Sequence, residues 1–250
     1  IPENQALPDR VHLVWNGVNN QQNLDQFPES DVFWGKLDVR TGVDNHECIL
    51  RADSFLSHPP RRGETWLNFS DTFQQFREAG KGINIHLTEG KPLLIKVAQE
   101  LVESGMDNKR LWFSGDLVST GKTIFEHINE MFPGAVVQCD VDFLVPMILS
   151  MPHQAHRILN EVSGWGVNLF SLNWKPAYPG KIINILDEWG IPVNLQNIPD
   201  LEGFLQAVYL MPYSVTADFN FPEWNYFGAG AGEDGYFYTY PRFASFPQAR

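Results

Sequence analysis

The sequence predicts a single (β/α)₈ barrel, in which eight parallel strands close into a ring and each is followed by a helix. The chain has 250 residues, a length that such barrels use as one domain. Eight short apolar runs alternate with stretches of helical periodicity. A doubly wound open sheet of this length usually has fewer strands and a glycine-rich first turn, so the barrel fits better. We expect residues 1–250 to form this one domain.

The expected strands are short and mostly apolar, as is typical of parallel strands that are buried on both faces. In chain order they are Val11–Trp15, Val32–Val39, Ile83–Thr88, Arg110–Ser114, Ala135–Asp140, Val167–Leu172, Pro192–Gln196 and Val215–Phe219. Between them, apolar residues recur at helical spacing. This spacing predicts helices at Leu93–Val102, Ile124–Phe132, Ser70–Ala79, Val145–Asn160, Gly180–Trp189 and Asp200–Tyr209.

About forty residues separate the second expected strand from the third. They include Glu47–Ala52, which reads as an additional extended segment, and the turn-rich stretch Ser57–Gly63. Long loops that leave a barrel mouth commonly shape a binding site. We therefore expect the loop after the second strand to lie near the functional end of the barrel.

An aromatic tail follows the last expected strand, because residues 219–250 hold 11 of the 33 aromatic side chains around a glycine run. So many rings must dock on the barrel. Two interpretations remain open: the tail is a strap over an exposed surface, or it is a lid that stacks on a ligand. In the second, Trp224 is among the tail residues nearest the ligand.

Composition excludes some classes of function. The formal net charge of −12 repels phosphate backbones, so general nucleic-acid binding is disfavoured. No apolar run approaches the roughly 20 residues of a membrane span. The first residues, Ile1 and Pro2, fit a mature chain that has lost a signal peptide, so we expect secretion to the extracellular space.

The two cysteines, Cys48 and Cys139, are too few for a disulfide framework and have no metal-binding spacing, so we expect at most one bridge between them. The loop from Gly115 to Gly121 places five residues between its glycines, where a phosphate-binding loop needs four. Neither a Gly-x-Ser-x-Gly elbow nor a His-Glu-x-x-His helix occurs. Hydrolase and zinc-protease mechanisms therefore lack their starting motif.

In a barrel of this class, residues at the carboxyl ends of the strands converge on the site. The candidates are Trp15, Asn16, Lys36, Asp38, Arg40, His86, Asp116, Asp140, Asp142, Asn173, Trp174, Gln196, Asn197 and Asp218. With His58, the carboxylates and His86 have the chemistry of hard-metal ligands and of proton transfer. The alternative is that these polar groups only form hydrogen bonds at strand ends.

Several short motifs occur in the order of a known family. They are Trp15–Asn20, Gly35–Val39, His58–Pro60 and Lys81–Leu87, followed by Pro192–Asn197 and Val215–Phe219. This order resembles the menorin family, a branch of the phospholipase-C-like barrels that also include the glycerophosphodiester phosphodiesterases. The resemblance covers most of residues 11–220. It implies a barrel fold and, for the superfamily, metal-dependent cleavage of phosphodiesters.

The resemblance breaks at positions that carry this chemistry. Asn16 stands where the superfamily has a catalytic histidine, Lys36 replaces the first acid of its Glu-x-Asp, and His86 replaces a further acid. An amide cannot take up a proton near neutral pH, and a lysine places a like charge beside a metal ion. Asp38 remains, and His58 would correspond to a second family histidine.

Two hypotheses follow from these departures. The first is a secreted, non-catalytic barrel that binds a small molecule or an extracellular protein at its mouth, with Trp224 from the tail and without a cofactor. The second is a divergent phosphodiesterase that acts on glycerophosphodiesters or lysophospholipids. In it Asp38, His86 and nearby aspartates hold Mg²⁺ or Ca²⁺, and His58 transfers protons. The sequence does not indicate an oligomeric state.

Overall fold

The computed structural model describes residues 10–43, 47–60, 63–174 and 179–219, with the backbone of 225–227 and 237–239. Within this part of the chain, eight parallel strands form a closed ring, because β1 pairs with both β2 and β9. The ring strands are β1 (His12–Trp15), β2 (Trp34–Thr41), β4 (Gly82–Leu87), β5 (Leu111–Asp116), β6 (Val136–Asp140), β7 (Leu169–Asn173), β8 (Val193–Ile198) and β9 (Ser214–Ala217). The predicted (β/α)₈ barrel is confirmed.

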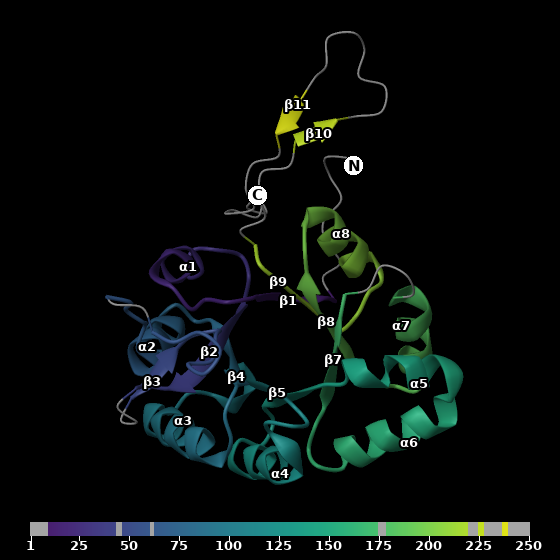
Figure 1. Ribbon diagram of the computed structural model, residues 1–250, viewed down its shortest axis with the longest axis horizontal. Helices are drawn as coiled ribbons and strands as arrows, with labels where there is room; N and C mark the ends of the chain where they lie inside the picture. Colours follow the sequence, from purple (N-terminus) through teal and green to yellow (C-terminus); the bar gives the residue numbers. More distant parts are fainter. Residues whose placement is uncertain are drawn as a thin grey trace.

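Helices surround the ring of strands (Figure 1). They are α1 (Gln21–Gln26), α2 (Phe69–Glu78), α3 (Lys91–Ser104), α4 (Gly121–Met131), α5 (Val145–Ser150), α6 (Pro152–Ser163), α7 (Pro179–Glu188) and α8 (Leu201–Tyr209), with short 3₁₀ turns at Asn108–Arg110 and Asp142–Leu144. Each long helix buries an apolar stripe, as helical periodicity requires. In α3 the buried residues include Leu94, Val97 and Leu101.

Two helices differ from the expectation. The stretch expected as one helix, Val145–Asn160, is divided into α5 and α6 at Met151, whose φ of −138° and ψ of 62° are not helical. The reason is Pro152, because a proline disfavours the helical conformation in the residue before it. The short helix α1 was not expected. Its N-terminus is capped by Asn20, whose side chain accepts a hydrogen bond from the backbone N–H of Asn23.

The long connection between β2 and α2 contains the short strand β3 (Cys48–Leu50). This strand pairs with β2 in antiparallel orientation and confirms the expected extended segment. The side chain of Arg40 forms hydrogen bonds with the backbone that follows β3. Its Nε donates to the carbonyl of Arg51 at 2.9 Å, and its Nη2 donates to the carbonyl of Ala52 at 2.8 Å. The loop is therefore held at the carboxyl end of β2.

The N-terminal end of the barrel interior is closed by apolar side chains. Trp34 and Trp112 contact each other edge to face, with ring centroids 5.3 Å apart, and Val14 and Leu169 complete the cluster. Above this cluster the interior becomes polar, although branched apolar residues usually fill such barrels. The buried polar side chains of the ring strands are Asp38, Asn84, Ser114, Gln138, Ser171, Asn194, Gln196, Ser214 and Thr216.

The remaining expectations concern the cysteines and the tail. Cys48 and Cys139 are both free and buried, so they form no bridge with each other. In the tail, β10 (Asn225–Phe227) pairs with β11 (Phe237–Thr239) in antiparallel orientation. Trp224 and most other tail residues lie outside the described residues, so the docking of the tail stays a prediction.

Candidate functional site

A cavity of about 290 Å³ lies at the carboxyl ends of the barrel strands. Its lining is almost entirely polar and comes from β2, β4, β5, β6, β7 and β8. The lining residues are Lys36, His86, Ser114, Gly115, Asp116, Gln138, Asp140, Ser171, Gln196 and Asn197. Convergence of polar groups from six strands at this end is the arrangement in which barrels of this class carry their sites.

His86 is held by a carboxylate on the neighbouring strand. Its Nδ1 lies 2.7 Å from Oδ1 of Asp38, while Asn19 donates to Oδ2 of Asp38 at 2.6 Å. Burial raises the pKa of Asp38, but the hydrogen bond with His86 and the charge of Lys36 outweigh it and lower this pKa to about 2. Asp38 is therefore ionised at neutral pH and orients the imidazole, which leaves Nε2 for the cavity.

Two further carboxyl groups, those of Asp140 and Asp116, line the cavity, and their pKa values are shifted in opposite directions. Burial, reinforced by the charge of Asp142, raises the pKa of Asp140, although Gln196 donates to its Oδ2 at 2.7 Å. In Asp116, burial is outweighed by hydrogen bonds from the backbone of Val118 and from Ser119, so its pKa is lowered. Carboxyl groups with pKa values shifted apart in one cavity are suited to different roles.

Lys36 supplies positive charge to the same cavity. It is half-buried on β2, and its ammonium group has neither a hydrogen bond nor an ion pair with any of the described residues. Its charge acts on Asp38, two positions further along the strand. A half-buried ammonium group without a partner is available to a ligand.

Asn197 borders the cavity in an unusual backbone conformation, with a φ of 57°. Its Nδ2 donates to Oδ1 of Asn173 at 2.5 Å, which holds the side chain against the end of β7. Asparagine is one of the residues that adopts this conformation most readily, and Asn197 lies where the register between β8 and β9 shifts, between Leu195 and Ile198.

Six of the candidate residues that the sequence predicted at the strand ends line the cavity: Lys36, His86, Asp116, Asp140, Gln196 and Asn197. Asp38 is absent from the lining, but it contacts His86, which does line the cavity. Trp15 and Trp174, by contrast, are buried in the core between strands and helices and are absent from the lining. Trp15 packs against Phe27 and Phe219.

Other predicted residues lie around the cavity or away from it. Asn173 supports Asn197, and Arg40 fastens the loop after β3, while Asn16 and Asp218 are strand-end residues that do not line the cavity. The exposed side chain of His58 lies 3.6 Å from Asp53 and contacts Ser57. His58 is therefore not joined to Asp38 or His86 by a contact.

The residues at the mouth do not fit Mg²⁺ or Ca²⁺. Within the described ranges, no group of three or more His, Cys, Asp or Glu side chains is arranged to hold a metal ion. The carboxylates of Asp38, Asp116 and Asp140 already accept hydrogen bonds from neighbouring groups. Lys36 adds a positive charge to the same cavity, whereas these cations need several uncommitted oxygen ligands.

Four residues of the site were not predicted from the sequence: Asn19, Ser114, Gln138 and Ser171. The last three are polar residues at inward-facing positions of otherwise apolar strands, and this alternation is the signal that could have identified them. Asn19 lies in the loop after β1, and only the fold places its amide against Asp38.

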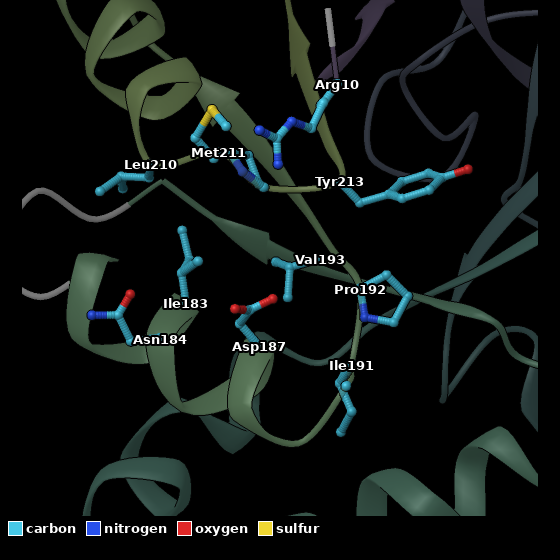
Figure 2. Close-up of a pocket in the computed structure, with 12 residues that line it drawn as sticks. Arg10, Ile183, Asn184, Asp187, Ile191, Pro192, Val193, Leu210, Met211 and Tyr213 are labelled. Carbon is cyan, nitrogen blue, oxygen red and sulfur yellow. The ribbon is translucent and has the colours of Figure 1, made fainter. Parts of the chain in front are cut away.

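A larger cavity, of about 500 Å³, lies at the opposite end of the barrel, next to α7 and the segment before β9. Figure 2 shows Arg10 and Asp187 approaching it from different sides, beside Ile183 and Val193. Its lining does not combine a histidine with carboxylates as the mouth does. We therefore place the candidate site at the mouth, where the titratable groups converge.

No family model and no curated protein matches the chain. Solved structures do match its fold. A phosphodiesterase of Oleispira antarctica, in complex with the product sn-glycerol-3-phosphate, is 12% identical with a TM-score of 0.61, over 85% of this chain and 93% of that one. A glycerophosphodiester phosphodiesterase of Parabacteroides distasonis is 11% identical with a TM-score of 0.59, over 84% and 94%.

A glycerophosphodiester phosphodiesterase of Agrobacterium tumefaciens gives the same result, with 12% identity and a TM-score of 0.59 over 83% of this chain and 95% of that one. The chain therefore shares the barrel fold of glycerophosphodiester phosphodiesterases. None of the helices in the described part of the chain has the length and apolar character of a membrane span.

Proposed function

We propose that the barrel mouth binds a small phosphorylated polyol, such as a glycerol phosphate, and that the protein is a secreted, menorin-like barrel without metal-dependent activity. The observation that carries this proposal is the unpaired Lys36 in a polar cavity that also contains Asp116 and Asp140. An ammonium group is the natural partner of a phosphate, whereas carboxylates accept hydrogen bonds from hydroxyl groups. A ligand that carries both groups satisfies both sides of the cavity.

The size of the cavity and the comparison support the same ligand class. A volume of about 290 Å³ is at the small end for ligand sites, so it suits a compact polar molecule rather than a lipid chain. The similar barrel of Oleispira antarctica holds sn-glycerol-3-phosphate. The order of motifs from Trp15 to Phe219 supports the menorin-like assignment.

Calorimetric titration with sn-glycerol 3-phosphate in the presence of EDTA tests this proposal. We expect saturable binding by the unaltered protein, and a loss of roughly tenfold or more in Lys36→Met, because a charged hydrogen bond contributes about 1.5–3 kcal/mol. Lys109→Met, which removes a lysine outside the cavity lining, is the matched control. Binding that requires a divalent cation, or no binding at all, would contradict the proposal.

A second candidate function is metal-independent cleavage of a phosphodiester, and the contact between His86 and Asp38 favours it. In that case His86 Nε2 removes the proton from a hydroxyl group of the substrate, whose oxygen forms a bond to phosphorus as the bond from phosphorus to the leaving oxygen breaks. Lys36 offsets the negative charge on the phosphoryl oxygen atoms. Asp140, whose pKa is raised by burial, donates a proton to the leaving oxygen at a pH below its pKa in the folded protein, where it is protonated. Turnover of glycerophosphodiesters that persists in EDTA and disappears in His86→Gln would establish this activity.

A further inference from the structure

Three carboxamide side chains in the barrel interior have their oxygen atoms already engaged. Oδ1 of Asn84 accepts from the hydroxyl of Ser114 at 2.7 Å, and Oε1 of Gln138 accepts from the indole of Trp112 at 3.1 Å. Oδ1 of Asn194 accepts from the hydroxyls of Ser214 at 2.8 Å and Thr216 at 3.0 Å. The amide nitrogens of these three side chains are therefore the atoms that can still donate hydrogen bonds into the barrel interior.

These donors lie at one level of the barrel. Each layer of side chains in such a barrel comes from alternate strands, and the shear of the barrel moves a layer about two residues forward from one alternate strand to the next. The register aligns Asn84 with Val136, so the layer of Asn84 continues at Gln138 on β6 and at Asn194 on β8. In the ring order, β4 and β8 are four strands apart, so Asn84 and Asn194 approach from opposite walls. Gln138 lines the cavity at the mouth, whereas Asn84 and Asn194 are absent from its lining, so the layer begins at the cavity floor and continues beneath it.

Two of the amide nitrogens, Nδ2 of Asn84 and Nδ2 of Asn194, are buried and have no acceptor, and Oγ of Ser171 has no partner either. Asn84, Asn194 and Ser171 are each 0% exposed. An unpaired buried polar group costs about 1–3 kcal/mol, and apolar residues would fill the same positions without that cost. The unpaired N–H groups of Asn84 and Asn194 and the hydroxyl of Ser171 are therefore suited to a hydrogen-bond acceptor on a ligand that enters from the cavity.

We propose that the layer of Asn84, Gln138 and Asn194, together with Lys36 and Ser171, is a deep subsite for an oxoanion group of the phosphate class. The inference rests on the proposed function and adds an orientation: the ligand enters with its phosphate first. Its hydroxyl groups then remain near Asp116 and Asp140. Amide and ammonium groups present only donors, which match the acceptor oxygens of a phosphate.

Inorganic phosphate offers the same oxygen atoms as a phosphorylated polyol. Titrations therefore use three probes in parallel: inorganic phosphate, sn-glycerol 3-phosphate and glycerol. For the unaltered protein we expect binding of both phosphate probes and none of glycerol at equal concentration. Tighter binding of sn-glycerol 3-phosphate than of inorganic phosphate would assign the subsite to a polyol phosphate, and the reverse order would assign it to the free anion.

Asn194→Asp and Asn194→Leu test the subsite. The first replaces donors with a carboxylate and the second with an apolar group of similar volume, and we expect both to weaken phosphate binding roughly tenfold to a hundredfold. We also expect Asn194→Leu to lower the melting temperature, because the buried hydroxyls of Ser214 and Thr216 lose their acceptor. Asn160→Asp, the same change at an exposed position of α6 outside the interior, is the matched control.

Ser171→Val provides a second variant at the cavity floor if Asn194 variants fold poorly, and we expect the same loss of phosphate binding. Binding of sn-glycerol 3-phosphate that is unchanged in Asn194→Leu and Ser171→Val would overturn the subsite and leave the proposed function standing. Failure of the unaltered protein to bind either phosphate probe would overturn both. A crystal structure with phosphate at the rim, away from Asn194, would also overturn the subsite.

Discussion

Asp38 and His86 are direct partners in the parallel register of β2 and β4, and their side chains meet inside the barrel with Oδ1 2.7 Å from Nδ1. The same register pairs Lys36 with Asn84 one inward-facing position lower. Two neighbouring strands thus place a hydrogen-bonded carboxylate and imidazole at the mouth, and the ammonium group of Lys36 with the amide of Asn84 one position below. The chemistry of the cavity follows from this register.

Asp38→Asn is expected to destabilise the protein in a pH-dependent way. The pKa of Asp38 is about 2 in the folded protein, against an ordinary value of 3.8. A lowered pKa contributes stability above pH 3.8, and this contribution is lost as the pH falls towards 2. Urea unfolding should show a loss of about 2 kcal/mol at pH 6 that largely disappears near pH 2. Asp187→Asn is a control, and an equal loss at both pH values would contradict the assignment.

Asp140→Asn is expected to have the opposite effect. Burial raises the pKa of Asp140 in the folded protein, so the folded state binds more protons than the unfolded state just above pH 3.8. Stability therefore falls as the pH rises through the folded pKa. We expect the variant to be more stable than the unaltered protein at pH 7 and to lose this advantage below pH 3.8. Thermal unfolding across this range measures the difference, and equal stability at pH 7 would argue against a buried, unfavourable charge.

The barrel itself was predictable because its strands are buried on both faces and read as separate apolar runs between amphipathic helices. The mouth residues His86, Asp116 and Asp140 were predictable because each ends or nearly ends a strand, and strand ends converge in a barrel. Trp15 and Trp174 also lie at strand ends, but their side chains are buried between the strands and the surrounding helices rather than in the barrel interior. Which side of the ring a strand-end residue faces depends on pleat and register, which the apolar runs alone do not fix.

The polar interior was not predicted, for a related reason. Asn84 and Asn194 each interrupt an apolar strand, and in a single sequence such residues resemble ordinary tolerated substitutions. Only the closed ring brings them into one layer below Lys36. The position of His58 likewise depends on how the long loop after β2 folds.

Met211→Gly is expected to leave stability unchanged or to raise it by up to about 1 kcal/mol. Met211 follows α8 with a φ of 57°, a conformation that glycine adopts without strain, and its side chain is 45% exposed. Relief of strain should therefore exceed the loss of packing and the greater entropy of the unfolded chain. Chemical denaturation measures the change, with Tyr209→Gly inside α8 as a destabilising comparison. A loss above about 1 kcal/mol in Met211→Gly would show that its side chain packs more than its exposure indicates.

Gly35→Ala is expected to destabilise the barrel by about 1–3 kcal/mol, because overpacking of a tight core forces side chains from their preferred positions. A methyl group on Gly35 would lie 2.5 Å from Cε1 of Phe76 and 2.9 Å from Cε1 of Phe27. These two rings stack on each other with centroids 4.6 Å apart, so neither can move away freely. Gly90→Ala is the control, because its added methyl group meets no atom within 4 Å. Since Gly35 precedes Lys36 on β2, we also expect the displacement of this strand in Gly35→Ala to weaken binding of sn-glycerol 3-phosphate. Equal stability of Gly35→Ala and Gly90→Ala would contradict the prediction and show that α2 moves away at little cost in free energy.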